Sequence, residues 1–183
     1  ACLDHVFQNK RASCLVNPRA CYETELNFDA ASTPKKIAVV GAGPAGMAFS
    51  VYAAQRGHQV TLFDKDTQIG GQFNYAKQIP GKEEFHQTLR YFGEMLKVNK
   101  VNVQLNSEQT AESLAAGGYD HVVLSSGIKA RQLDIPGFDH PKVLSYLDVL
   151  KHHKPVGQNV AVIGAGGIGF DVSEYLTEPH SLT

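Results

Sequence analysis

The sequence IAVVGAGPAG at residues 37–46 decides the fold. Its first four residues form a short apolar run, which is typical of a strand buried on both faces of a parallel sheet. The last six match the G-x-G-x-x-G pattern, residues 44–56 continue as a helix, and Gly57 ends that helix. Residues 59–63 predict the next strand, with Asp64 at its carboxyl end. This order predicts an α/β fold, a Rossmann-like doubly wound parallel sheet that binds dinucleotides.

Each glycine of the turn has its own physical reason. Gly41 permits the tight turn, Gly43 lets the backbone approach a pyrophosphate closely, and Gly46 lets the helix pack against the strand. The amino end of the helix adds free N–H groups and a partial positive charge. Asp64, 18 residues after Gly46, can accept hydrogen bonds from the ribose hydroxyls of an adenosine. The alternative, a glycine-rich turn without a ligand, is disfavoured by the combination of strand, turn, helix and acidic strand end.

A second copy of this pattern lies near the end of the chain. Residues 159–163 predict another buried strand, and Gly164, Gly166 and Gly169 fall on the same motif positions. Residues 36–46 and 159–169 therefore form an internal repeat, which indicates two dinucleotide sites or a duplicated fold. The residue that would read the second ribose is expected near position 189, about 20 residues past the last glycine. The 183 residues therefore do not decide between NAD and NADP.

The remaining pattern adds a loop-rich beginning over residues 1–35 and four further elements. These are a helix at 82–97, strands at 101–105 and 121–124, and a short helix at 144–150. The predicted division has three parts: a lead-in segment at 1–33, an incomplete first nucleotide-binding domain at 34–157, and the first strand, turn and helix of a second at 158–183.

Composition argues for small-molecule partners. The chain is 43% hydrophobic with a formal net charge of -1, which gives no electrostatic reason to expect nucleic acid or an anionic membrane. No apolar run approaches the roughly 20 residues that span a bilayer, and no secretory signal is recognisable, so we expect a cytoplasmic protein. Because the chain begins at Ala1 and ends within a helical pattern at Thr183, we expect it to be part of a longer protein.

Several short motifs together resemble the two-dinucleotide-binding flavoproteins, in which the first turn holds FAD and the second holds NAD(P)H. Beside the first glycine turn these motifs are LFD at 62–64, IGGQF at 69–73, SSG at 125–127 and IPG at 135–137. Two longer runs, AKQIPGKEEF at 76–85 and HPKVLSYLDVL at 140–150, resemble the bacterial NADPH-dependent 2,4-dienoyl-CoA reductases, relatives of Old Yellow Enzyme. This resemblance covers essentially the whole chain.

The resemblance implies a multi-cofactor enzyme of unsaturated fatty acid β-oxidation. In that family an amino-terminal barrel binds FMN and the enoyl substrate, a [4Fe-4S] cluster follows, and carboxyl-terminal domains bind FAD and NADPH. The catalytic Tyr and His of the family lie in the barrel, so no catalytic residue is assigned to the present chain. The chain is expected to bind FAD and relay electrons from NADPH, and by itself to be inactive.

The cysteines match half of the family's cluster ligands. Cys2 and Cys14 reproduce the last ligand interval, while the first two ligands would precede Ala1. Because a cluster needs four thiolates, none is expected with these two alone. A disulfide between them is the alternative, which an intracellular location disfavours. Cys21 matches no ligand position and is expected to be a free thiol.

The resemblance also places residues at FAD. The pyrophosphate is expected at Gly41, Gly43, Pro44, Ala45 and Gly46, the ribose at Asp64, and the adenosine edge at Lys65. The phosphate and ribityl portion is expected at Gly71 and Gln72, the adenine at Gln109, and the crossing beneath the cofactor at Ser126 and Gly127. Lys82 is expected to supply positive charge to the pyrophosphate. A solvated lysine and an ordinary loop residue remain the alternatives for Lys82 and Gln109.

Two other functions stay open. The first is an amine dehydrogenase of the trimethylamine or histamine type, and the second is a nucleotide-binding module without turnover. Intact glycine turns in both halves favour a working NAD(P)H route over the first. No acyl-CoA site is visible in the residues themselves, so the substrate rests on the resemblance. The oligomeric state is not predicted.

Overall fold

The computed structural model describes residues 5–14, 17, 19–131 and 134–178. Its centre is one parallel sheet of four strands in the order β3-β2-β1-β4. The strands are β1 (Lys36–Val40), β2 (Gln59–Phe63), β3 (Asn102–Gln104) and β4 (His121–Leu124). All neighbours are parallel, with Lys36 opposite Gln59 and Ile37 opposite His121. The predicted α/β class and parallel sheet are confirmed.

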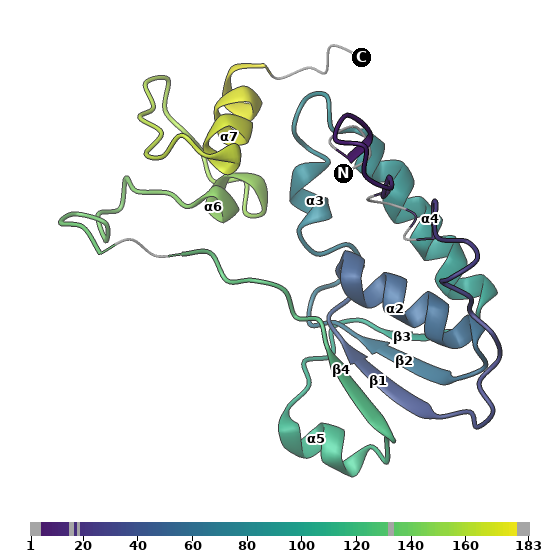
Figure 1. Cartoon of the computed structure of the whole chain (residues 1–183). Helices are drawn as coiled ribbons and strands as arrows, with labels where there is room; N and C mark the ends of the chain where they lie inside the picture. Colours follow the sequence, from purple (N-terminus) through teal and green to yellow (C-terminus); the bar gives the residue numbers. More distant parts are fainter. Residues whose placement is uncertain (1–4, 15–16, 18, 132–133, 179–183) are drawn as a thin grey trace.

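Helices cover both faces of the sheet unequally. Figure 1 shows α2 (Pro44–Gln55) and α4 (Glu84–Val98) on one face and the short α5 (Ala111–Ala116) on the other. The larger core lies beneath α2 and α4, where Met47 and Leu62 are fully buried. Burial of such side chains contributes about 1.5–3 kcal/mol each, so this face holds the sheet together. It also fixes α2, and with it the first glycine turn.

Helix α5 was not predicted. It is only six residues long and buries none of them, so it has no apolar stripe to mark it. Its sequence signal is the cap: the Thr110 hydroxyl accepts from the Ser113 N–H, and the Ser113 side chain accepts from the Thr110 N–H. This reciprocal pair satisfies two N–H groups at the start of the helix.

The second half of the chain departs from the sheet. After β4, no helix or strand is present in the described residues before α6 (Tyr146–Leu150), and α7 (Gly167–Thr177) follows it. The prediction of a strand at 159–163 is wrong for this structure, since that segment is irregular and Ile163 is 74% exposed. A strand needs a hydrogen-bonded neighbour, and no described segment pairs with this one.

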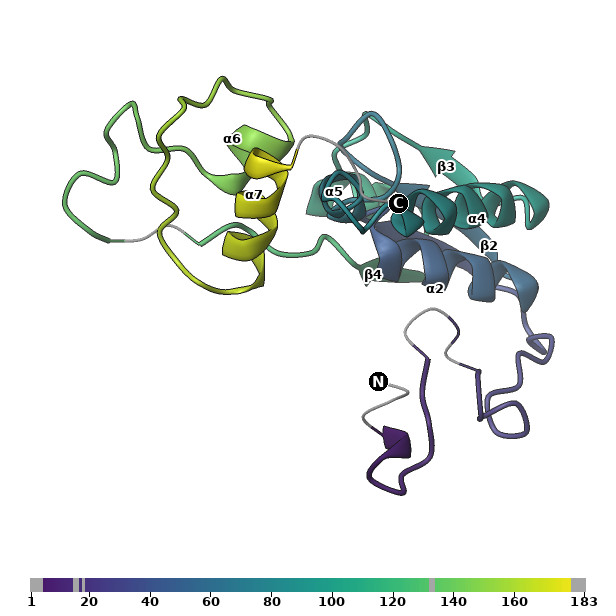
Figure 2. The same ribbon diagram turned by 90° about the horizontal axis from the view of Figure 1, so that it is seen from above.

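A second apolar cluster joins α6 and α7 to the first half. It contains Ile79, Val149, Leu150 and Val172, with Tyr75 packed against it. Tyr75 belongs to α3 (Phe73–Ala76), and Figure 1 shows α6 and α7 beside that helix. Figure 2 shows the same α6–α7 pair from above. The α6–α7 unit is therefore docked on the segment that follows β2.

The lead-in segment is loop-rich, as predicted, in the residues that the structure describes. It reaches α2 through Phe28, whose ring stacks on Tyr52 with centroids 4.4 Å apart. None of the helices in the described part of the chain is long and apolar enough to cross a membrane.

Candidate nucleotide-binding site

The first glycine turn leads from β1 into α2. Gly41 has a φ of +108°, in the region that favours glycine, and its N–H donates to the Phe63 carbonyl 2.8 Å away. Gly43 is the N-cap of α2 and has no side chain to cap the helix. Pro44 follows as the first helical residue, where its missing N–H costs nothing. The amino end of α2 therefore keeps uncapped N–H groups, which suits an anion.

Two of the glycines are required by the chain itself. A Cβ on Gly41 would lie 2.3 Å from the Ser125 carbonyl oxygen, and a Cβ on Gly46 would lie 1.9 Å from the Gly41 carbonyl oxygen. Gly43 differs, because a Cβ there would meet nothing within 4 Å. The space beside Gly43 is therefore open to a ligand at the helix amino end, as expected for a pyrophosphate.

Asp64 closes the turn from the end of β2. One carboxylate oxygen accepts the Ala42 N–H at 2.6 Å, and the other accepts the Asp66 N–H at 2.8 Å. The half-buried carboxylate therefore ties the glycine turn to β2, a role in addition to the ribose contact that the sequence predicts. This second role was missed, and the strand-end position of the acid was its only sequence signal. Lys65 is exposed at the same strand end.

The Gly70–Gly71 loop lies against the first turn. The Gly70 N–H donates to the Ala42 carbonyl at 2.8 Å, and a Cβ on Gly71 would lie 3.1 Å from the Gly43 Cα. Gly71 has a φ of +52° and borders the open space beside Gly43. The structure thus brings together two loops that lie 28 positions apart in the sequence.

The end of β4 passes beside Gly41. The Ser125 hydroxyl donates, in a shared bond, to the carbonyls of Val40 and Gly41 at 3.0 and 2.9 Å. Ser126 follows with its Cα 3.0 Å from a Cβ built on Gly41, and Gly127 has a φ of +75°. Sequence reasoning named Ser126 and Gly127 but missed Ser125, although the SSG motif contained it.

Replacement of Ser125 by alanine is expected to lower the free energy of unfolding by about 1–2 kcal/mol, because two turn carbonyls lose a hydroxyl donor. Urea titration followed by circular dichroism measures the change. The exposed neighbour Ser126→Ala is the matched control and should stay within about 0.5 kcal/mol of the unsubstituted chain. Equal effects at the two positions would contradict a special role for Ser125.

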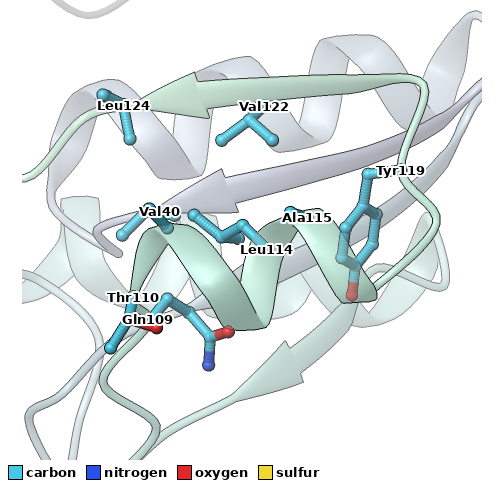
Figure 3. Close-up of a pocket in the computed structure, with 9 residues that line it drawn as sticks. Val40, Gln109, Thr110, Leu114, Ala115, Tyr119, Val122 and Leu124 are labelled. Atoms are coloured by element: carbon cyan, nitrogen blue, oxygen red, sulfur yellow. The ribbon is translucent and has the colours of Figure 1, made fainter.

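Gln109 and Lys82 each have partners within the protein. The Gln109 amide donates to the Ser107 hydroxyl at 2.9 Å and accepts from the Ser113 hydroxyl at 2.9 Å. Figure 3 shows it at the start of α5, on the rim of an open hollow of about 540 Å³ lined mainly by apolar side chains such as Leu124. Lys82 forms an ion pair with Asp171 of α7, with Nζ 2.6 Å from Oδ1.

The second glycine turn repeats the geometry of the first. Gly164 has a φ of +117°, and Gly166 is the extended N-cap of α7. A Cβ on Gly169 would lie 2.1 Å from the Gly164 carbonyl oxygen, which matches the Gly46 contact of the first turn. The internal repeat therefore extends from sequence to backbone conformation, although the strand before the second turn is absent.

A small polar hollow of about 250 Å³ lies where the segment after β2 meets the end of α6. Its lining includes Asp66, Asn74, Tyr75, Gln78 and Lys151. The Lys151 ammonium donates to the Asp66 carboxylate at 2.9 Å, and this bond raises the pKa of Lys151 above its ordinary value.

A separate set of polar contacts surrounds Asp148 of α6. Hydrogen bonds from Lys154 and Ser145 hold the pKa of Asp148 well below its usual range.

The cysteines form no metal site among the described residues, where no group of three or more His, Cys, Asp or Glu side chains is arranged around a common point. Cys2 lies outside the described residues, and Cys14 is exposed. Cys21 is a free thiol, as predicted, and it is exposed.

Comparison with known proteins places these features in a family. The model of the pyridine nucleotide-disulphide oxidoreductases matches residues 35–181. A metal reductase of Desulforamulus reducens is 36% identical over 99% of this chain and 28% of its own length. A solved 2-naphthoyl-CoA reductase in complex with 2-naphthoyl-CoA is 33% identical, with a TM-score of 0.92 over 96% of this chain and 27% of its own.

A third match extends the range of chemistry. The solved 6-hydroxypseudooxynicotine amine oxidase of Pseudomonas geniculata N1 is 30% identical, with a TM-score of 0.73 over 85% of this chain and 25% of its own. The present chain thus spans about a quarter of the length of the proteins it matches.

Proposed function

Because this chain belongs to the pyridine nucleotide-disulphide oxidoreductase family, we propose that it is the FAD-binding part of a flavin-dependent oxidoreductase that draws electrons from NAD(P)H. The observation that carries the proposal is the open space beside Gly43, bordered by Gly71 and by the amino end of α2. We assign residues 34–157 to the FAD domain and 158–183 to the beginning of the NAD(P)H domain.

The residues fit FAD by their chemistry. Uncapped N–H groups of α2 suit the pyrophosphate, and the Asp64 carboxylate suits the ribose hydroxyls. Gly71 and Gln72 are proposed to flank the phosphate and ribityl portion, and Ser126 and Gly127 the crossing beneath it. Bound FAD supplies the capacity to accept a hydride, while the protein supplies position and electrostatics.

For the whole protein we propose reduction of a conjugated double bond of a 2,4-dienoyl-CoA by NADPH, in the cytoplasm, with FMN and a [4Fe-4S] cluster as further carriers. Cys2 and Cys14 are proposed as two of the cluster ligands. The resemblance of residues 76–85 and 140–150 supports this reaction, and so does likeness to a reductase whose complex holds an aromatic CoA thioester. The acyl-CoA site would lie outside this chain.

An amine-oxidising function is the second candidate, favoured by the likeness to the amine oxidase. The second glycine turn discriminates between them, since its backbone repeats the first turn and is suited to a pyridine nucleotide. Oxidation of NADPH by the whole protein in the presence of a dienoyl-CoA supports the reductase, whereas reduction of the flavin by a methylamine supports the alternative.

Flavin retention tests the proposed FAD site directly. The purified chain is incubated with FAD and desalted. Its absorbance is then recorded at about 450 nm, where flavin cofactors absorb. A flavin band is expected. A chain shown by circular dichroism to be folded, yet free of flavin and with no measurable FAD affinity by calorimetry, would contradict the proposal.

Replacement of Asp64 by asparagine is expected to weaken FAD binding by roughly 10- to 100-fold, because charge-assisted hydrogen bonds contribute about 1.5–3 kcal/mol. Isothermal titration with FAD measures the loss. The matched control is Asp139→Asn, which removes one exposed carboxylate away from the turn and should bind FAD normally. If Asp64→Asn bound FAD with unchanged affinity, the ribose role of Asp64 would be wrong.

A further inference from the structure

A single segment of the first half, residues 66–82, carries both the site and the docking surface. Its beginning holds Gly70 and Gly71, which lie against the first glycine turn. Its later part holds Tyr75 and Ile79, which pack in the second apolar cluster with α6 and α7. The segment therefore contacts both the first glycine turn and the α6–α7 unit.

Polar contacts surround that apolar cluster. The Gln78 side chain donates to the Leu150 carbonyl at 2.9 Å, and Lys151 pairs with Asp66 at 2.9 Å. Lys82 pairs with Asp171 at 2.6 Å. These three contacts join residues 72, 85 and 89 positions apart in the sequence, so they report tertiary docking and not local structure.

The Lys82–Asp171 pair is a charged contact between residues 66–82 and the helix of the second turn. Asp171 lies in α7, which begins at Gly167 within the glycine turn itself. Its side chain is 28% exposed and that of Lys82 is 39% exposed, so the pair is partly shielded from water. The described residues between β4 and α6 form no helix or strand, so this connection does not hold α7 in place. The position of α7 therefore depends on its tertiary contacts.

We propose that Lys82 and Asp171 are positioning residues: their ion pair fixes the second glycine turn against residues 66–82 and so sets the geometry of hydride transfer. This inference rests on the proposed function. In that step a hydride leaves NAD(P)H, which is oxidised to NAD(P)⁺, and FAD is reduced as it takes up the hydride and one proton from water. Lys82 thus acts through α7, not on the pyrophosphate.

Hydride transfer is sensitive to such positioning. A misplacement of about 1 Å between reacting groups can slow a reaction by about 100-fold. Loss of the pair is therefore expected to slow flavin reduction by about tenfold or more. FAD content should be unchanged, because Lys82 is engaged with Asp171 and the pyrophosphate site is formed by the α2 turn.

The test uses the FAD-loaded whole protein with three variants: Lys82→Met, Asp171→Asn, and the charge exchange Lys82→Asp with Asp171→Lys. Anaerobic stopped-flow mixing with NADPH gives the flavin reduction rate, and absorbance gives the FAD content. Amide hydrogen exchange of residues 167–177 reports the docking of α7 without any cofactor. Lys97→Met is the matched control, since Lys97 pairs at 2.8 Å with Glu94 within α4.

The expected result is slow flavin reduction, full FAD content and faster exchange in α7 for both single variants, with recovery in the charge exchange and no change in Lys97→Met. Wild-type reduction rates in the single variants, or no recovery in the charge exchange, would overturn the proposal. Loss of FAD from Lys82→Met would instead assign Lys82 to the pyrophosphate and overturn it too. If the wild-type protein holds no FAD, the proposed function fails, and unchanged exchange in α7 would separately overturn the docking role.

Discussion

Replacement of Gly46 by alanine is expected to lower the free energy of unfolding by about 3 kcal/mol or more, the upper range for overpacking a close-packed site. A methyl group at this position would lie 1.9 Å from the Gly41 carbonyl oxygen and 2.6 Å from the Ser125 hydroxyl. The first contact is with backbone, so helix α2 would have to move away from β1. Urea titration followed by far-ultraviolet circular dichroism measures the loss.

The control for this prediction is the same substitution in a helix with room for it. Gly93 lies inside α4, and a Cβ there would lie 3.6 Å from the Ile69 side chain, an ordinary contact. Gly93→Ala should therefore stabilise the chain by about 0.5–1 kcal/mol, the usual helix preference for alanine. A Gly46→Ala chain as stable as the Gly93→Ala chain would mean that the helix and strand do not approach as closely as described.

Replacement of Gly43 by valine is expected to remove FAD binding, by about 1,000-fold or more in affinity, and to leave the fold intact. A Cβ at Gly43 meets no protein atom within 4 Å, and the extended backbone at this N-cap suits any residue. The valine side chain would fill the space proposed for the pyrophosphate. A loss of about 4.1 kcal/mol corresponds to that factor.

Isothermal titration with FAD measures the affinity, and thermal unfolding without FAD verifies the fold. Gly157→Val is the matched control, because a Cβ at Gly157 also meets nothing within 4 Å and its φ is ordinary. The Gly157 variant should bind FAD as the unsubstituted chain does. FAD binding by Gly43→Val at full affinity would place the pyrophosphate elsewhere.

Sequence alone was sufficient for the first nucleotide unit. The apolar run of β1, the glycine turn and the acidic end of β2 are local signals, and each depends on neighbours within about 30 residues. The predicted helix at 44–56 became Pro44–Gln55, and the strand at 59–63 was found as predicted. The resemblance placed Gly43 and Gly71 beside the same cofactor, but the direct approach of their two loops was not predicted.

What sequence could not supply depends on tertiary partners. Residues 159–163 have the composition of a buried strand, but pairing decides whether a strand forms, and no described segment pairs with them. The partner of Lys82 lies 89 positions away, beyond any local pattern. Helix α5 was missed because its cap, not an apolar stripe, marks it. The first two differences come from tertiary interactions that local spacing does not encode, whereas α5 had a local signal in its cap.

The register of the sheet has a consequence for the order of folding. β1 pairs with β2 across 23 positions, from Lys36 to Gln59, but with β4 across 84, from Ile37 to His121. Because closing a longer loop costs more chain entropy, the β1–α2–β2 unit is expected to form early and β4 to join late. Ser125 arrives with β4 and bonds the Gly41 carbonyl only then. A ligand that requires the finished turn would therefore bind after the slow step and hold the last strand in place.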